Sequence, residues 1–404
     1  MRILLGTDTY PPDINGAAYF TQRLACGLRD RGHELRIVCP ALSRGSTEDR
    51  LDDLPVSRIA SVPVPTYPAL RFCLPLRSVK QDLAAVVADF EPDLIHTQNH
   101  FLLSRLLIRL GHDNGIPVLA TNHFVPENIL VQIEFFPKPL RSAIGRWMGR
   151  DLARVYNGAT AVSAPTPTAA RLLETQGVLH RVQPISCGLD LSVFTPTEET
   201  APTRERFSIP DRPTFMFVGR LDVEKRIDEL IRAVPLVRET IDAQLVIVGQ
   251  GKERPKLERL ASELGVADRV VFTGFLADAD MPHIYAACDV FCIAGTAELQ
   301  SIVTLEALAV GRPVVAVDVL ALPHLARTGE NGYTYTPGHP EELAAHVARL
   351  LTDGALRRRM GARSIEIAAE HDIGRTLDEF EDLHRRTTGR PVVDRDAVPA
   401  ARAG

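Results

Sequence analysis

The sequence has no long apolar segment, no strongly basic stretch and no paired-cysteine motif, and each absence excludes a class of protein. No run reaches the ~18 apolar residues that a membrane-spanning helix needs. The apolar run at residues 3–6 is far too short for a secretory signal peptide. The formal net charge is -5, which argues against a dedicated nucleic-acid binder, because such proteins usually present a basic face.

The cysteine pattern points to a reducing compartment. None of the six cysteines stands in a Cys-x2-Cys pair or at zinc-ligand spacing with a histidine. Several lie inside apolar runs, where a thiol behaves as a small buried hydrophobic group. We therefore expect a soluble, cytoplasmic protein, with a peripheral position at the inner face of the cell membrane left open. The cysteines are Cys26, Cys39, Cys73, Cys187, Cys288 and Cys292.

Length and composition predict more than one ordinary globular domain. The chain has 404 residues, of which 45% are hydrophobic and 24% charged. At about 100–200 residues per domain, it is long enough for two or three domains with cores of their own. Intrinsic disorder, collagen and coiled coil are excluded as descriptions of the whole chain.

Apolar runs alternate with helical periodicity in both halves of the sequence. Short runs without polar alternation are typical of strands covered on both faces, and strands joined by helices form parallel sheets. The fold class is therefore α/β, with two doubly wound domains. The expected strands are 2–7, 35–39, 93–96, 117–120 and 159–163, then 215–218, 244–248, 269–272, 290–293 and 313–317. Residues 43–80 fit less well and are expected to be loop with irregular strand.

A polar stretch at 196–213 has no periodic apolar face and marks the boundary between the domains. We expect an N-terminal domain at 1–195 on the acceptor side and a C-terminal domain at 205–370. A helix at 371–387 is expected to pack back toward the N-terminal domain. The tail at 388–404, rich in Gly, Arg, Asp, Ala and Pro, is expected to be disordered.

Several segments follow expected strands, at the sheet edge where α/β proteins bind ligands, and a cleft between the domains is the natural site. In the turn at 15–17, Gly16 allows a close backbone approach, and a plain tight turn is the alternative. In 218–225, Arg220 and Lys225 suit a diphosphate clamp, with a solvated charged loop as the alternative.

Acidic and imidazole side chains follow other strands. In 294–306, Glu298 lies in a loop and Glu306 in a helix that begins near Ser301, so the pair could accept hydrogen bonds from sugar hydroxyls. An exposed glutamate pair is the alternative. His123 follows the strand at 117–120 and is a candidate polar contact or acid–base group, or else an ordinary core or surface histidine.

These motifs together resemble the GT-B glycosyltransferases of family GT4. The turn at Asn15-Gly16, His123, Gly219-Arg220 with Lys225, and Glu298-(seven residues)-Glu306 occur in that order in the family. The resemblance covers residues 1 to about 385. It implies two Rossmann-like domains that face a central cleft.

The resemblance also implies a nucleotide diphosphate sugar as donor substrate, with no metal and no other cofactor. Arg220 and Lys225 would neutralise the pyrophosphate and stabilise the departing diphosphate. Glu306 would bind the ribose, and Glu298 would bind the hydroxyls of the donor sugar.

Further contacts are implied on both sides of the cleft. His123 would contact the sugar from the N-terminal domain, and Gly16 would let the backbone approach the phosphates. Gly249 and Leu276, the latter beside Phe275, lie where the family places phosphate-side and base contacts.

The sequence departs from the family's pattern directly after the first glutamate. Many relatives carry Gly-Phe-Gly there, and this chain has Leu299-Gln300-Ser301. Gln300 and Ser301 are expected to supply side-chain contacts in place of bare backbone groups, which leaves the donor sugar open. Asp278-Ala279-Asp280 has the Asp-x-Asp pattern of some metal sites. It precedes an expected helix, so we interpret it as a helix cap.

Residues 135–156 predict a basic amphipathic helix with an aromatic anchor, which can lie on an anionic membrane. A helix packed in the core with a wet basic face is the alternative. The basic residues are Lys138, Arg141, Arg146, Arg150 and Arg154, and the apolar ones are Ile144, Trp147, Met148, Leu152 and Val155, preceded by Phe135-Phe136.

The leading prediction is a retaining transferase that moves glucose or mannose from UDP or GDP to a hydroxyl of a lipid, such as a diacylglycerol or glycolipid. A soluble sugar or secondary metabolite as acceptor, and a sugar-nucleotide epimerase of the same fold, are the alternatives. A phosphorylase would need a pyridoxal-phosphate lysine context that we do not find. A nonenzymatic binder would tolerate loss of Glu298 and His123, and both are present.

Overall fold

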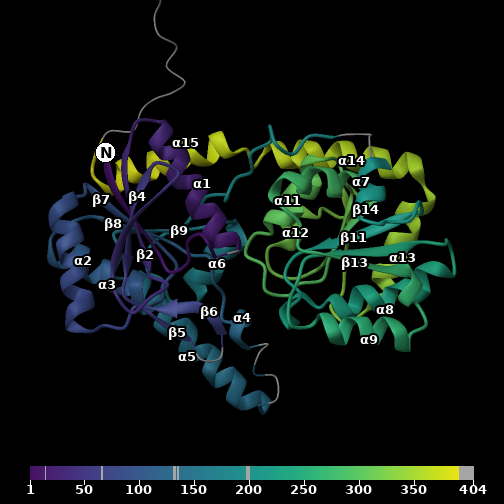
Figure 1. The fold of residues 1–404 in the computed structure, drawn as a ribbon, viewed down its shortest axis with the longest axis horizontal. Coiled ribbons are helices and arrows are strands. Elements are labelled where there is room, and N and C mark those ends of the chain that lie inside the picture. Colours follow the sequence, from purple (N-terminus) through teal and green to yellow (C-terminus); the bar gives the residue numbers. More distant parts are fainter. Residues whose placement is uncertain (14, 65–66, 131–132, 134–135, 197–200, 391–404) are drawn as a thin grey trace, which may run out of the picture.

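The protein forms two α/β units joined side by side, each with a parallel sheet between layers of helices (Figure 1). The structure, a computed structural model, describes residues 1–390 apart from 14, 65–66, 131–132, 134–135 and 197–200. The predicted α/β class with two doubly wound sheets is confirmed. Of the expected disordered tail, residues 391–404 lie outside the described residues, as does Phe135.

The N-terminal unit is built on an eight-stranded sheet of order β10-β9-β8-β7-β1-β2-β4-β3, parallel except for the β3–β4 pair. Its strands are β1 (Arg2–Thr7), β2 (Glu34–Pro40), β3 (Thr47–Leu51), β4 (Leu54–Ile59), β7 (Leu94–Gln98), β8 (Val118–Thr121), β9 (Ala161–Ala164) and β10 (Gln183–Pro184); β5 (Val62–Val64) and β6 (Tyr67–Phe72) pair separately. Its helices are α1 (Gly16–Asp30), α2 (Arg77–Phe90), α3 (Leu102–Asp113), α4 (Glu127–Leu130), α5 (Lys138–Tyr156) and α6 (Pro167–Thr175).

The C-terminal unit has a six-stranded parallel sheet of order β13-β12-β11-β14-β15-β16. Its strands are β11 (Thr214–Val218), β12 (Gln244–Val248), β13 (Val270–Gly274), β14 (Val290–Ile293), β15 (Val314–Val317) and β16 (Gly332–Tyr335). Its helices are α7 (Ala201–Arg206), α8 (Ile227–Arg238), α9 (Arg254–Glu263), α10 (Met281–Ala286), α11 (Ile302–Ala309), α12 (Leu322–Leu325), α13 (Pro340–Thr352) and α14 (Gly354–Ala369), with 3-10 turns η2 (Val223–Lys225), η3 (Ala267–Arg269) and η4 (Asp278–Asp280).

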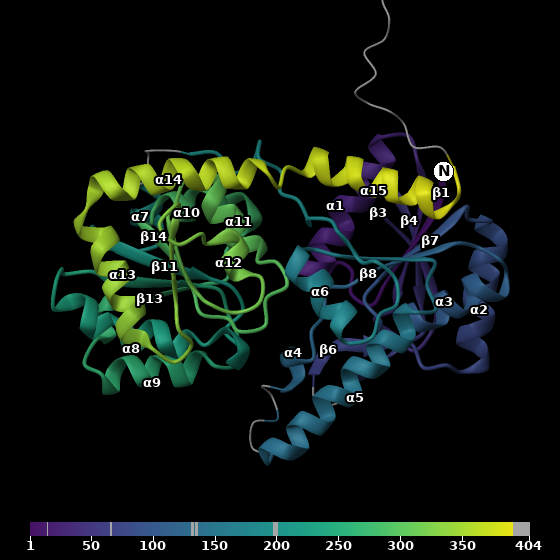
Figure 2. The ribbon, with the colours of Figure 1, turned by 180° about the vertical axis from the view of Figure 1, so that it is seen from behind.

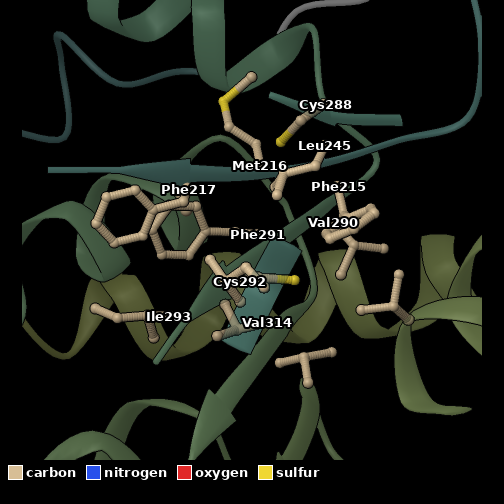
Figure 3. Close-up of a cluster of buried hydrophobic side chains, with 14 of the residues drawn as sticks. Phe215, Met216, Phe217, Leu245, Cys288, Val290, Phe291, Cys292, Ile293 and Val314 are labelled. Carbon is tan, nitrogen blue, oxygen red and sulfur yellow. The ribbon is translucent and has the colours of Figure 1, made fainter. Parts of the chain in front are cut away.

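Buried apolar strands form the core of the C-terminal unit. Every residue of β11, β12, β14 and β15 is buried, as expected for parallel strands with helices on both faces. Figure 3 shows Phe215, Phe217 and Phe291 packed together with Cys292. The cysteines are all free thiols, and only Cys26 is not fully buried. This rigid sheet fixes the turns at its carboxyl edge, where the candidate site lies.

Two expectations from the sequence were wrong in detail. Residues 43–80 contain the β3–β4 hairpin, and β4 joins the main sheet beside β2. β3 is charged and exposed because it is an edge strand, which such residues protect from pairing with other chains. Asp280 stands at the N-cap of α10, but its side chain makes no capping bond and pairs instead with Arg206 at 2.5 Å.

The last helix, α15 (Ile373–Thr387), lies against the N-terminal unit (Figure 2). Leu377, Phe380 and Leu383 belong to its core cluster, and the Phe380 ring lies 5.8 Å from that of Phe20 in α1. The chain therefore passes between the units twice, once after β10 and once between α14 and α15. The two crossings are paired, because the Leu189 amide donates to the carbonyl of His371 at 2.9 Å.

Candidate active site

The turn after β11 brings Arg220 and Lys225 to the carboxyl edge of the C-terminal sheet. The turn is tight because Gly219, at φ 153°, and Gly249, at φ 128°, both adopt conformations that other residues rarely take. A Cβ on Gly249 would lie 2.0 Å from the carbonyl oxygen of Gly219. Gly249 is thus required for the turns after β11 and β12 to pack together next to Arg220.

A dense cluster of charges surrounds the two cations. The ammonium of Lys225 lies 2.6 Å from Glu298 Oε1 and 3.7 Å from Glu224 Oε1. The guanidinium of Arg220 lies 3.1 Å from both Asp222 Oδ2 and Glu224 Oε1. Burial disfavours the charge on Lys225, but the negative charges of Glu298 and Glu224 outweigh it and raise its pKa. Lys225 is therefore a fixed, fully charged ammonium.

Glu306 lies on α11 and faces a phenol of the neighbouring helix. The Tyr285 hydroxyl donates a hydrogen bond of 2.7 Å to Glu306 Oε2. Burial raises the pKa of the Glu306 carboxyl to about 7, although this bond and the charge of Arg23 on α1 both act to lower it. Glu306 can therefore change its charge near neutral pH.

His123 lies in the N-terminal unit, directly after β8. Its Nε2 lies 2.8 Å from Gln98 Oε1, its backbone amide donates to Asn99 Oδ1 at 3.2 Å, and its ring centroid lies 4.9 Å from that of Phe20. Burial lowers the pKa of His123 to about 4. The imidazole is thus neutral at physiological pH and is held by neutral partners.

The first turn of α1 is open and capped. The Asn15 side chain accepts a hydrogen bond of 3.0 Å from the Ala18 amide, while a Cβ added to Gly16 would meet no atom within 4 Å. The helix therefore begins with open space beside Gly16, and the N-terminus of a helix suits an anion.

The side chains of three other predicted site residues, Leu276, Ser301 and Gln300, contact other parts of the protein. Leu276 is buried in the core of the C-terminal unit, whereas its neighbour Phe275 is 49% exposed. The Ser301 hydroxyl caps α11 and lies 2.8 Å from Thr304 Oγ1. The Gln300 amide is turned toward the crossing after β10 and not toward the cationic pair. These contacts differ from the donor contacts expected of Gln300 and Ser301.

Sequence reasoning missed some of the residues that shape the site. Glu224 and Asp222 lie within the same turn as the cations, but only the positive residues were considered there. The available signal in the sequence was the acidic residue Glu224 directly before Lys225. Tyr285 and Gln98 had none, since each reaches its partner only through the packing of separate elements.

Comparisons with known proteins show the family of the chain. A model of "Glycosyltransferase Family 4" matches residues 14–193, and a model of "Glycosyl transferases group 1" matches residues 200–366. The chain is also 30% identical over 338 residues to the GDP-mannose-dependent alpha-mannosyltransferase of Mycobacterium tuberculosis (strain CDC 1551 / Oshkosh), covering 81% of this chain and 83% of that protein. The chain belongs to glycosyltransferase family 4. It is therefore a glycosyltransferase, as predicted.

Other known proteins resemble this family 4 enzyme over nearly its whole length. The alpha-monoglucosyldiacylglycerol synthase of Streptococcus pneumoniae is 28% identical, with 94% of this chain and 85% of that protein aligned. Among solved structures, Anabaena HepE in complex with UDP-glucose superposes with a TM-score of 0.75 at 21% identity, covering 95% of this chain and 99% of that one. These solved structures show that the predicted GT-B fold is correct.

Proposed function

We propose that this family 4 enzyme transfers glucose or mannose from a nucleotide diphosphate sugar to a hydroxyl of a membrane lipid, with retention of the anomeric configuration. The observation that carries the proposal is the convergence of Arg220, Lys225 and Glu298 in one charged cluster. The names of similar proteins support it, since they include a GDP-mannose-dependent mannosyltransferase and a monoglucosyldiacylglycerol synthase.

The cationic pair would stabilise the leaving diphosphate. As the bond between the anomeric carbon and the phosphate oxygen breaks, negative charge grows on that oxygen, and preorganised cations lower the energy of this state. Glu224 and Glu298 already hold Lys225 in place, so little reorganisation is needed. No metal or other cofactor is part of the proposal, because Arg220 and Lys225 supply the positive charge.

Glu298 and His123 would orient the sugar from opposite walls. A carboxylate accepts hydrogen bonds from sugar hydroxyls, and Glu298 stands next to the ammonium that would hold the diphosphate. With Gln98 Oε1 as acceptor, His123 carries its proton on Nε2 and offers Nδ1 as an acceptor. Glu306 would accept hydrogen bonds from the ribose.

Retention would follow from attack on the face that the diphosphate leaves. The acceptor oxygen bonds to the anomeric carbon as the bond to the phosphate oxygen breaks, and the acceptor's proton passes to that phosphate oxygen. No covalent enzyme intermediate forms. The neutral His123 fits this scheme because it need not carry a proton between the two substrates.

Helix α5 supports a lipid acceptor. It extends away from the body of the N-terminal unit (Figure 1), and Trp147 is 66% exposed. Arg146 and Arg150 share this exposed face, and within the described part of the chain no carboxylate pairs with either. Leu152 is buried in the core, so the helix is anchored near its C-terminal end, whereas its first residues, 138–140, are exposed. Such a face suits the anionic inner leaflet of the cell membrane.

No helix among the described residues is long and apolar enough to span a bilayer. The proposed contact is therefore peripheral, through the face of α5 that carries Arg146, Trp147 and Arg150. We expect it to bring the cleft close to acceptor lipids.

The proposal is tested with a panel of UDP- and GDP-sugars, first by donor hydrolysis and then by transfer to diacylglycerol in vesicles with and without anionic lipid. We expect one donor to be used and transfer to require the vesicles. The double substitution Arg146→Gln with Trp147→Ala should reduce vesicle binding about tenfold, since each surface cation contributes about 1 kcal/mol there. Arg259→Gln, on the exposed face of α9, is the matched control.

Other results would revise the proposal. Transfer to a soluble sugar with no effect of vesicles would reject the lipid acceptor but keep the transferase. Conversion of the donor into its epimer without transfer would favour the epimerase alternative. Product of inverted configuration, seen by NMR of the new linkage, would reject retention.

A further inference from the structure

The loop that carries Glu298 makes contacts with the N-terminal unit on both sides of that residue. It runs from Ala294 to Ser301, between β14 and α11. On one side, Asn128 Nδ2 of α4 donates to the carbonyl of Ala297 at 3.3 Å. On the other, Thr166 Oγ1, at the N-cap of α6, donates to the carbonyl of Leu299 at 3.0 Å. The loop of one unit is thus bound at its middle by the other.

Leu299 strengthens this attachment through apolar packing. Its side chain is only 7% exposed and belongs to the hydrophobic core cluster of the N-terminal unit, although the residue itself follows β14. Burying a leucine side chain is favourable because it removes apolar surface from water. Separation of the two units would expose this side chain to water.

Gln300 ties the same loop to both interdomain crossings. Its Nε2 donates to Ser186 Oγ at 2.9 Å, and its Oε1 accepts from the Cys187 amide at 2.7 Å. The second crossing contributes His371, whose Nδ1 lies 3.4 Å from Gln300 Nε2 and 2.9 Å from Ser186 Oγ. Burial lowers the pKa of His371 to about 4, so the ring is neutral and its Nδ1 can accept a hydrogen bond from either group. One amide therefore joins three segments.

We propose that Leu299 and Gln300 are positioning residues that couple closure of the two domains to the placement of the Glu298 carboxylate. Glu298 Oε1 lies 2.6 Å from the Lys225 ammonium while its loop holds this path. Within its own unit the loop is held by the Thr296 amide, which donates to the carbonyl of Glu224 at 3.2 Å, and by the Ala321 amide, which donates to the carbonyl of Glu298 at 3.3 Å. Groups on α4, α6 and the crossings hold the same loop in this relative orientation of the units. This inference rests on the proposed function in one respect, the role of Glu298 at the donor sugar.

The coupling has a consequence that a purely structural role does not have. Arg220 and Lys225 belong to the turn after β11, and Glu224 of the same turn pairs with both of them whether or not Glu298 is in place. Binding of a nucleoside diphosphate should therefore survive the loss of Gln300. Binding of the attached sugar should not, because it depends on Glu298. The ratio of the two affinities therefore reports on the positioning role.

The test compares the full-length wild type with Gln300→Leu, which keeps the volume and removes the amide. Affinities for the preferred nucleotide sugar and for its nucleoside diphosphate are measured by calorimetry. We expect nucleoside diphosphate binding to change less than twofold and nucleotide-sugar binding to weaken about tenfold, the effect of one lost hydrogen bond. Gln22→Leu, which removes an exposed amide of α1 that bonds Asp52, is the matched control.

Hydrogen exchange tests the coupling without any substrate. The Cys187 amide loses its acceptor in Gln300→Leu and should exchange about tenfold faster, as should peptides that contain Thr166 and Leu299. Ser186→Ala removes only one of the partners and serves as the milder variant if Gln300→Leu does not fold. It should shift the same affinity ratio by less.

Two results would overturn the coupling: equal losses of both affinities, or unchanged exchange at Cys187. A wild type that binds no nucleotide sugar would instead reject the proposed function, and the exchange measurement would still decide whether Gln300 holds the units together.

Discussion

The C-terminal and N-terminal sides of the proposed cleft, here called its two walls, hold their polar groups in opposite ways. On the C-terminal wall, the Lys225 ammonium lies 2.6 Å from Glu298 Oε1 and 3.7 Å from Glu224 Oε1. On the N-terminal wall, His123 is hydrogen-bonded to an amide, and burial keeps its pKa at about 4. The comparison indicates that the two walls have different roles. One wall can balance the charge of an anionic substrate, and the other can only orient neutral groups.

The neutral wall is continuous with a buried network that reaches the C-terminal helix. Gln98 Nε2 lies 3.1 Å from His96 Nε2, and His96 Nδ1 lies 3.1 Å from His384 Nε2 on α15. Burial lowers the pKa of His96 well below its usual range and that of His384 to about 3. A charge on any of these rings would be desolvated at high cost. Helix α15 thus completes the N-terminal wall.

The largest expected effect comes from the charged wall. Lys225→Met removes the ammonium and leaves Glu298 and Glu224 without its charge. We expect kcat/KM to fall about 10³-fold, the upper range for loss of one preorganised donor at a leaving group. Lys252→Met, which removes a half-exposed ammonium 3.6 Å from Asp222, is the control and should change kcat/KM only a few-fold.

Circular dichroism and melting curves of the Lys225→Met protein check that its fold is intact. Glu298→Ala should also abolish transfer, because the sugar loses its proposed acceptor. Near-normal turnover in either folded variant would contradict the role given to that residue, and with it the contrast between a charged and a neutral wall.

A smaller effect is expected on the neutral wall. His123→Phe keeps the aromatic packing on Phe20 and removes both ring nitrogens. We expect kcat to fall roughly 10²-fold, the lower range for a positioned polar group at the reaction centre. The wild-type ring is neutral down to about pH 4. The pH profile of kcat should therefore have the same shape near pH 6.5 in the wild type and in the variant, with no step that only the wild type shows. Such a step would mean that His123 carries a charge, and the comparison of the walls would fail.

Features that depend on a local pattern could be predicted from the sequence. Strands such as 215–218 were found because a buried parallel strand is a continuous apolar run. Arg220 and Lys225 were found because they stand beside one such strand. β3 was missed because an exposed edge strand carries the charges of a loop, and β16 was not among the expected strands.

Contacts between distant segments lie beyond sequence reasoning. Leu299 and Gln300 were noticed only as a departure from the family's pattern, and side-chain contacts to the donor were expected of Gln300. Their partners are 133 and 113 residues away in the chain, so only the packing of the two units brings them together. The residue types at 299–301 do not indicate which distant segments they contact. The pairing of His123 with Gln98 was hidden for the same reason.

The smallest expected effect on substrate concerns Glu306, which combines features of both walls. It is acidic, like the residues of the first wall, and its burial raises its pKa far enough for it to lose its charge near neutral pH. Burial raises its pKa from 4.5 to about 7. Between these values the folded protein binds a proton that the unfolded chain does not, so the free energy of unfolding falls as pH rises. Above about pH 7 the full penalty, about 3 kcal/mol, is present.

Glu306→Gln removes this titration. Relative to wild type, the variant should gain stability between about pH 5 and pH 8, by up to about 3 kcal/mol in urea unfolding. Its affinity for nucleoside diphosphate should fall about tenfold at pH 8, where wild-type Glu306 is a carboxylate and accepts from the ribose, and less at pH 6, where the wild type is mostly protonated. A parallel pH dependence in both proteins would show that Glu306 stays ionised throughout and belongs wholly to the charged wall.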